Sequence, residues 1–173
     1  AAELTISSTG AVTVSSGTLT VGSLNIGHGA NGDTASTAVG TDALDASVSG
    51  STRNTAIGQS ALTALNHATA DYNVAVGSYA GQALTSGDRN TSVGDSALGT
   101  VDGHNNTAVG QAALNADCVD NNTAVGRNAL RFNTTASNNT AVGHQALDQN
   151  TTGANNVAVG SLTLDAATTA NNN

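Results

Sequence analysis

The chain has 173 residues, and Ala, Thr, Asn and Gly account for 97 of them, whereas Lys, Pro, Met and Trp are absent. With two Tyr and one Phe, it lacks the large apolar side chains whose burial offsets chain entropy in an ordinary globular core. The net charge of −8 disfavours binding to the phosphate backbone of nucleic acids.

No apolar run approaches the roughly 20 residues that cross a bilayer, and no stretch has the layout of a signal peptide, so we expect no membrane insertion. The single cysteine, Cys118, cannot form a disulfide within the chain. The chain starts without Met and ends on Asn171–Asn173, where another repeat would begin. We therefore expect it to be a piece of a longer protein.

Residues 1–30 form a lead-in segment that differs from the rest of the chain. Short runs alternate apolar and polar residues and are separated by Ser-Thr-Gly and Ser-Ser-Gly turns; the runs are 4–6, 11–14, 19–21 and 24–26. This pattern is typical of short strands.

Residues 31–173 repeat one motif, NTAVG or a close variant, eight times, and most units continue as xxAL. The closing glycines lie 16 to 19 residues apart and are Gly40, Gly58, Gly77, Gly94, Gly110, Gly126, Gly143 and Gly160. A period this regular predicts stacked units in which each repeat covers its neighbour. The predicted fold is all-β, a parallel β-solenoid or β-roll of about eight coils with 16–19 residues each.

Within the motif, Thr and Val are two residues apart and share one face of an extended strand, while Asn, Ala and Gly share the other. The Thr position also accepts Val74 and Val157 and never a charge, so we expect the Thr and Val face to point inward or into an interface. The fourth position is accordingly assigned to the structural core of the repeat: Val39, Ile57, Val76, Val93, Val109, Val125, Val142 and Val159. The closing glycines fit a turn with positive φ or a contact without room for a Cβ.

The xxAL half of the unit has two interpretations, a second short strand or a single helical turn. In the third unit Leu84 is displaced by three positions, and an insertion of three residues nearly keeps a helical phase, which favours the helical turn. The units close with Asn, Thr, Ser, Asp and Gly, which form turns, and their length varies there, so these loops are expected to point outward. One such column buries little apolar surface, so we expect several columns to associate and share their Val and Leu ladders.

Residues 139–153, with the sequence NTAVGHQALDQNTTG, closely resemble the NTAVGxxALxxNTTG repeats of phage tail fibre proteins. The array is also similar in pattern to the head repeats of YadA-like trimeric autotransporter adhesins, although its period is longer, which leaves the number of strands per coil open. The resemblance covers residues 17–173. It implies a parallel homotrimer, exposed on a virion or cell surface, whose partners are its own copies, other fibre or virion proteins and a host receptor.

Candidate sites for chemistry are few. The histidines His28, His67, His104 and His144 are not paired at metal-ligand spacing, and no glycine-rich phosphate loop is present. We therefore expect no metal, no cofactor and no enzyme activity. Sugar-binding sites usually contain an aromatic platform, so Tyr72, Tyr79 and Phe132 are the candidate receptor contacts. The alternative is that these three rings cover the solenoid edge or fill a subunit interface.

The leading functional hypothesis is a trimeric fibre segment, the shaft of a phage tail fibre or tailspike that presents a host-receptor-binding region. The alternative is the head of a bacterial trimeric surface adhesin. An ice-binding solenoid is a less favoured third hypothesis, which requires the Thr ladder to be flat and exposed. A polysaccharide-cleaving enzyme would need a pair of carboxylates on one face, and no pair stands out.

Overall fold

A computed structural model describes residues 19–21, 24–28, 35–47, 50–99, 102–116 and 119–173. These residues contain strands and turns and no helix. The strands are β1 (Leu19–Val21), β2 (Leu24–Gly27), β3 (Thr37–Val39), β4 (Thr55–Ile57), β5 (Val74–Val76), β6 (Thr91–Val93), β7 (Thr107–Val109), β8 (Thr123–Val125), β9 (Thr140–Val142) and β10 (Val157–Val159). None of the described segments forms a helix that could span a membrane.

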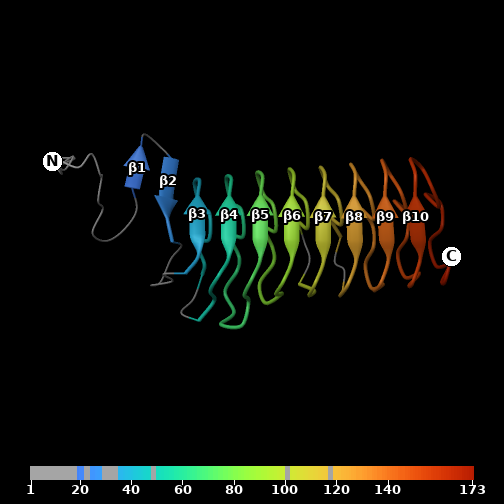
Figure 1. Cartoon of the computed structure of the whole chain (residues 1–173), viewed down its shortest axis with the longest axis horizontal. Coiled ribbons are helices and arrows are strands. Elements are labelled where there is room, and N and C mark those ends of the chain that lie inside the picture. The colour runs from blue at the N-terminus through green and yellow to red at the C-terminus, as the bar shows by residue number, and fades with distance from the viewer. Residues whose placement is uncertain (1–18, 22–23, 29–34, 48–49, 100–101, 117–118) are drawn as a thin grey trace.

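All ten strands belong to one sheet in sequence order (Figure 1). β1 pairs antiparallel with β2, and β2 pairs antiparallel with β3. From β3 to β10 every strand pairs in parallel with the next, and equivalent residues are partners, as in Thr107 opposite Thr123 and Val109 opposite Val125. The predicted parallel β-solenoid is confirmed; the strands from β3 to β10 define coils one to eight, and each coil contributes one three-residue strand.

The interior of the solenoid contains Ala and Leu. The central Ala of each strand, Ser92 in coil four, is buried, and so are the Ala and Leu of the xxAL segments in coils one, two and four to seven, whereas Leu164 of coil eight is partly buried. Ala108, Ala113 and Leu114 of coil five, for example, have no solvent exposure and pack in one cluster with their counterparts in the neighbouring coils. Small and large side chains thus alternate across a coil that is too thin for two large ones.

The xxAL segment is neither a strand nor a helical turn. The second and fourth residues after each closing glycine have positive φ, for example Ala112 at 52° and Leu114 at 50°. The Ala112 N–H donates to Asp95 of the preceding coil (3.0 Å), whereas the Leu114 N–H donates to Ala129 of the following coil (2.9 Å). Burying a Leu side chain contributes about 2–3 kcal/mol, which offsets the roughly 1–2 kcal/mol that the left-handed conformation of the Leu residue itself costs.

The third unit does not contain the expected insertion in this segment. Gly81, with φ 58°, takes the position that Leu62 has in the preceding coil, and a Cβ on Gly81 would lie 2.8 Å from the Leu62 Cδ2 atom. Leu84 matches Leu65, because both lie seven residues after the closing glycine and both are fully buried. Coil two thus has Leu at both positions, whereas coil three has Gly81 at the first and Leu84 at the second. No residues are inserted, so Leu84 gives no support for a helical turn.

A ladder of asparagines fastens each coil to the next. We use "Asn ladder" for the residue before each strand, which is buried in every coil: Ser36, Asn54, Asn73, Asn90, Asn106, Asn122, Asn139 and Asn156. The Asn122 Oδ1 atom accepts the N–H of Asn139 in the next coil (3.0 Å), and its Nδ2 atom donates to the carbonyl of Ala136 (2.9 Å). The same two contacts recur in most coils, so these side chains satisfy buried backbone groups that no strand partner reaches. In coil five, Asn106 makes the first contact, with the Asn122 N–H, and its Nδ2 group has no partner among the described residues.

We predict that Leu114→Ala destabilises the chain by about 3 kcal/mol, because it leaves a cavity in the interior ladder. Leu162→Ala is the matched control, since Leu162 has the same type of backbone conformation, with φ 60°, but is 52% exposed. Its expected cost is below about 1 kcal/mol. Urea unfolding measures both, and equal losses would contradict the assignment of the interior.

We predict that Asn122→Ala costs about 2 kcal/mol, because the buried Asn139 N–H loses its acceptor and the Ala136 carbonyl loses one of its two donors, the other being the Asn133 Nδ2 group. Asn66→Ala is the control, because Asn66 is exposed and, among the described residues, hydrogen-bonds only through its backbone. A change within about 0.5 kcal/mol is expected there. Similar unfolding midpoints for the two variants would mean that the ladder does not hold the coils together.

Candidate interaction surface

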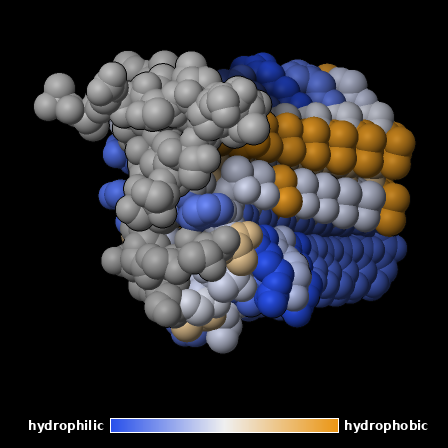
Figure 2. Space-filling view, turned by 60° about the vertical axis from the view of Figure 1, so that its left-hand side comes forward, coloured by the Kyte–Doolittle hydropathy of each residue, from blue (hydrophilic) through white to orange (hydrophobic). Residues whose placement is uncertain are grey.

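The outer face of the sheet carries two parallel rows of side chains. The Thr rank comprises Thr37, Thr55, Val74, Thr91, Thr107, Thr123, Thr140 and Val157; the Val rank comprises Val39, Ile57, Val76, Val93, Val109, Val125, Val142 and Val159. Figure 2 shows the Val rank as a continuous apolar band, next to a more neutral band with isolated apolar positions. No charged residue belongs to either rank.

The assignment of the Val rank to the repeat core is wrong for the single chain. Ile57 is 40% exposed, Val142 is 36% exposed, and the other members are at least half-buried except Val159, which is 68% exposed at the last strand. The pairing of Thr with Val on one face is as expected, but the face with Ala and Asn points inward. A coil this thin has room for a methyl group at the strand, whereas β-branched side chains pack well against identical neighbours on the pleated outer surface.

The closing glycines position both ranks by turning the chain out of each strand. Their φ values lie between 128° and 140°, a region that residues with a Cβ rarely adopt. A Cβ on Gly110 would also lie 2.6 Å from the carbonyl carbon and oxygen of Gly126 in the next coil. Both properties proposed from the sequence, positive φ and the absence of space, are present at this position.

The candidate receptor contacts lie in three different environments. Tyr72 and Tyr79 stand at the two ends of β5 and are 49% and 37% exposed. The Tyr72 ring lies between two guanidinium groups, with the Cζ atoms of Arg53 and Arg89 at 5.1 Å and 5.8 Å from its centroid. These arginines were not predicted, although the repeat places them in the same position as Tyr72, directly before the ladder Asn.

Phe132 belongs to a structural cluster in the loop after Leu130. The Arg131 guanidinium lies 4.2 Å from its ring centroid and pairs with the carboxylate of Asp148 (3.0 Å). Asp148 is almost fully buried, so the arginine neutralises a charge that would otherwise be costly, and the ring covers the arginine. Phe132 is therefore less suited to contact a receptor than Tyr72.

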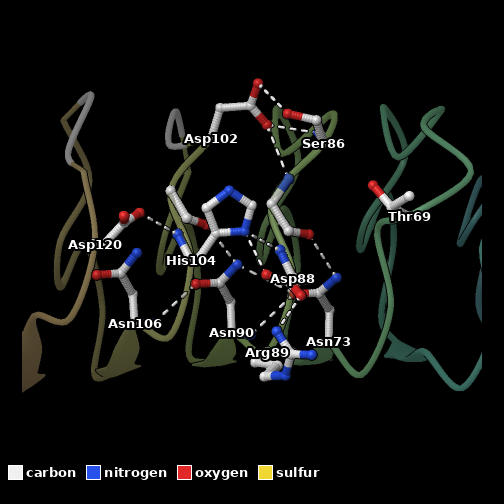
Figure 3. Close-up of polar contacts among 12 residues, drawn as sticks. Thr69, Asn73, Ser86, Asp88, Arg89, Asn90, Asp102, His104, Asn106 and Asp120 are labelled. Carbon is white, nitrogen blue, oxygen red and sulfur yellow. Dashed lines mark hydrogen bonds and ion pairs between the residues drawn. The ribbon is translucent and has the colours of Figure 1, made fainter.

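Polar loop residues of coils three to six form a second cluster (Figure 3). The His104 Nδ1 atom contacts the Asp88 carboxylate, which also pairs with Arg89, and the His104 N–H donates to Asp120 (2.8 Å). The Asp102 carboxylate binds a loop of the preceding coil, because it accepts hydrogen bonds from the backbone N–H groups of Thr85 (3.0 Å), Ser86 (2.6 Å) and Gly87 (3.2 Å).

These hydrogen bonds set the ionisation of Asp102. Partial burial raises the pKa of this carboxyl group, but the hydrogen bonds from Ser86 and Thr85 outweigh burial and lower the pKa below its ordinary value. The ionised carboxylate thus stabilises the loop at neutral pH.

Among the described residues, no group of three His, Cys, Asp or Glu side chains could hold a metal ion. His28 and His67 bind nearby loop atoms, those of Ser36 and Thr69, and His144 is exposed. Cys118 lies outside the described residues. The outer face and the group of Arg53, Tyr72 and Arg89 are therefore the surfaces best suited to interaction.

We predict that Asp102→Asn accelerates hydrogen exchange at the Ser86 and Gly87 amides at pH 7, with Asp95→Asn as a control on an exposed acid. A carboxyl group whose pKa is lowered on folding stabilises the protein above its unfolded pKa and loses that effect as pH falls through the folded value. The difference between the wild-type chain and Asp102→Asn should therefore shrink below about pH 3–4. A difference that is independent of pH would refute the role of ionised Asp102.

Comparisons of the chain with protein-family models, with curated proteins and with solved structures give no match. A functional conclusion therefore depends on the geometry of these surfaces.

Proposed function

We propose that the chain is a shaft segment of a homotrimeric fibre, of the phage tail fibre or tailspike kind, that presents a host-receptor-binding region. The observation that carries this proposal is the Val rank, which runs unbroken over eight coils on the outer face and leaves apolar side chains partly exposed. Soluble monomers rarely expose long contiguous apolar patches, and such patches commonly mark interfaces.

Three parallel copies would bury this face against one another. Because the strands are in register along the whole array, identical residues of three columns can meet at the same height around a common axis. The absence of charge from both ranks removes the like-charge repulsion that such an axis would otherwise produce. The exposed loops and the acidic side chains then remain on the outside of the assembly.

A shaft role suits the dimensions and chemistry of the column. Eight strands about 4.8 Å apart make a rod of about 35–40 Å, and every added coil extends the rod without changing its cross-section. The chain is poor in the aromatic side chains that dominate binding sites, which suits a spacer better than a receptor-binding tip. We place the trimer on a virion surface, with the head of a bacterial trimeric surface adhesin as the alternative setting of the same architecture.

An ice-binding solenoid is a second candidate because the Thr rank lies on the outer face in strict register, with Thr37 exposed and its other threonines at least half-buried. This hypothesis requires the face to be open to solvent, whereas the trimer covers it. Val74 and Val157 interrupt the rank, and both are exposed, which weakens the regular hydroxyl spacing that ice recognition would use.

We predict that the chain is a trimer by light scattering, and that Val109→Asp or Val125→Asp converts it to monomers with unchanged circular dichroism. The Val side chain points outward in the single column, so the coil itself tolerates the change, while three carboxylates at one axis do not. Thr134→Asp is the control, because Thr134 is exposed on a loop. A monomeric mass for the wild-type chain would contradict the trimer proposal. Thermal hysteresis in solutions of that monomer would establish the ice-binding alternative.

A further inference from the structure

The residue directly before the Asn ladder forms a row along one edge of the solenoid, and this row changes character along the chain. It contains Asn105, Asn121, Asn138 and Asn155 in coils five to eight, but Arg53, Tyr72 and Arg89 in coils two to four. All seven residues have positive φ, between 56° and 62°. The backbone is therefore the same throughout the row, and only the side chains differ.

The Arg and Tyr residues of the row adopt a left-handed backbone conformation that their residue types disfavour. Asn is the side chain other than Gly that most readily adopts the left-handed conformation, whereas Arg and Tyr do so at a cost. In return they add little to the interior, since the side chains of Arg53 and Arg89 are 57% and 59% exposed and Tyr72 is 49% exposed. Unfavourable backbone positions with exposed side chains are typical of functional sites.

The charge distribution also singles out this part of the row. The chain has four arginines, no lysine and a net charge of −8, yet two of the arginines flank one aromatic ring. The neighbouring acids Asp71 and Asp88 are only 23% and 17% exposed. Asp71 accepts the Thr52 N–H (2.6 Å) and Asp88 contacts His104, so each carboxylate divides its contacts between the loop and one arginine, Asp71 with Arg53 (3.8 Å) and Asp88 with Arg89.

The two guanidinium groups keep donors free for a ligand. In the contacts with described residues, Arg53 and Arg89 use only Nη1. In Arg53 this atom donates to the Thr52 hydroxyl and lies 3.8 Å from the Asp71 carboxylate, and in Arg89 it donates to Asp88. Their Nε and Nη2 groups have no hydrogen-bond partner among the described residues. A guanidinium group with such a free pair of donors binds a carboxylate in a bidentate manner.

We propose that Arg53, Tyr72 and Arg89 form a binding site for an acidic polysaccharide that carries carboxylates on alternate sugars. The two arginines are two coils apart, about 10 Å along the rod, a spacing similar to that of carboxylates on every second sugar of a chain. Each guanidinium group would bind one carboxylate, and the exposed edge and hydroxyl of Tyr72 would contact the sugar between them. This site deepens the proposed attachment role and rests on it for its biological setting, but its chemistry is independent of the trimer.

The test is calorimetric titration of the full chain with a hyaluronan oligosaccharide, which carries a carboxylate on alternate sugars, and with its methyl-ester derivative. We expect binding of the acidic form that weakens with salt, and no binding of the ester. Arg53→Asn/Arg89→Asn should weaken binding about tenfold or more, because charge-assisted hydrogen bonds are lost. This double variant should fold well, since Asn is the residue that coils five to eight have in this position.

Arg127→Asn is the matched control, because Arg127 is an exposed arginine that contacts Gln111, away from the row. It should bind the oligosaccharide within about twofold of the wild-type chain, since screening makes distant surface charges nearly irrelevant. As a gain-of-function test, Asn105→Arg, Asn121→Tyr and Asn138→Arg together copy the row into coils five to seven and should raise the stoichiometry from one site to two per chain.

Three results would overturn the proposal: equal affinity in the double variant, equal binding of the methyl ester, or equal binding of a single-stranded oligonucleotide of the same charge. Light scattering on the same samples separates this failure from that of the proposed function, because the trimer can persist when the oligosaccharide does not bind. Loss of binding in a variant that also loses its circular dichroism is resolved by the grafted row, which must then bind in coils five to seven.

Discussion

One asparagine side chain per coil holds the column together where the sheet cannot. The strands are only three residues long, so their own hydrogen bonds cover a small part of each coil. The ladder Asn accepts an N–H from the next coil and donates to a loop carbonyl, with distances of 2.8–3.0 Å for Asn73 and Asn139. An unpaired buried amide costs far more than a net hydrogen bond contributes, so the interior has to be completed by a side chain with both a donor and an acceptor.

Much of the fold follows from the spacing of residues in the sequence. The repeated Asn and Gly, 16 to 19 residues apart, require stacked coils, and the period of two in TAVG requires that Thr and Val share a face. The period does not say which face points inward. That choice depends on the diameter of the coil, which is set by contacts between Ala of the strand and Leu of the turn and is a property of the folded whole.

The conformation of the xxAL segment was beyond the reach of pattern reasoning. Helix and strand are the two regular alternatives, and alternating left-handed residues such as Asn128 and Leu130 belong to neither. Sequence preferences count against Leu in this conformation, so local propensity points away from the observed structure. The Arg-Tyr-Arg row is hard to predict for a related reason: the sequence marks Tyr72 as an aromatic residue, but its position relative to Arg53 and Arg89 becomes visible only when coils are aligned by their ladder Asn.

The antiparallel pair of β1 and β2 gives the stack a defined beginning. β2 covers the free edge of β3, and Ser36 takes the place of Asn as the acceptor for the Asn54 N–H (2.9 Å). From there the pairing of each strand with the next is a copy of the one before, since equivalent residues are always partners. A duplication or deletion of one whole unit would therefore preserve the strand pairing and change the height of the column. The length of such a rod can therefore change in steps of one strand spacing, and the number of repeats in the sequence determines it.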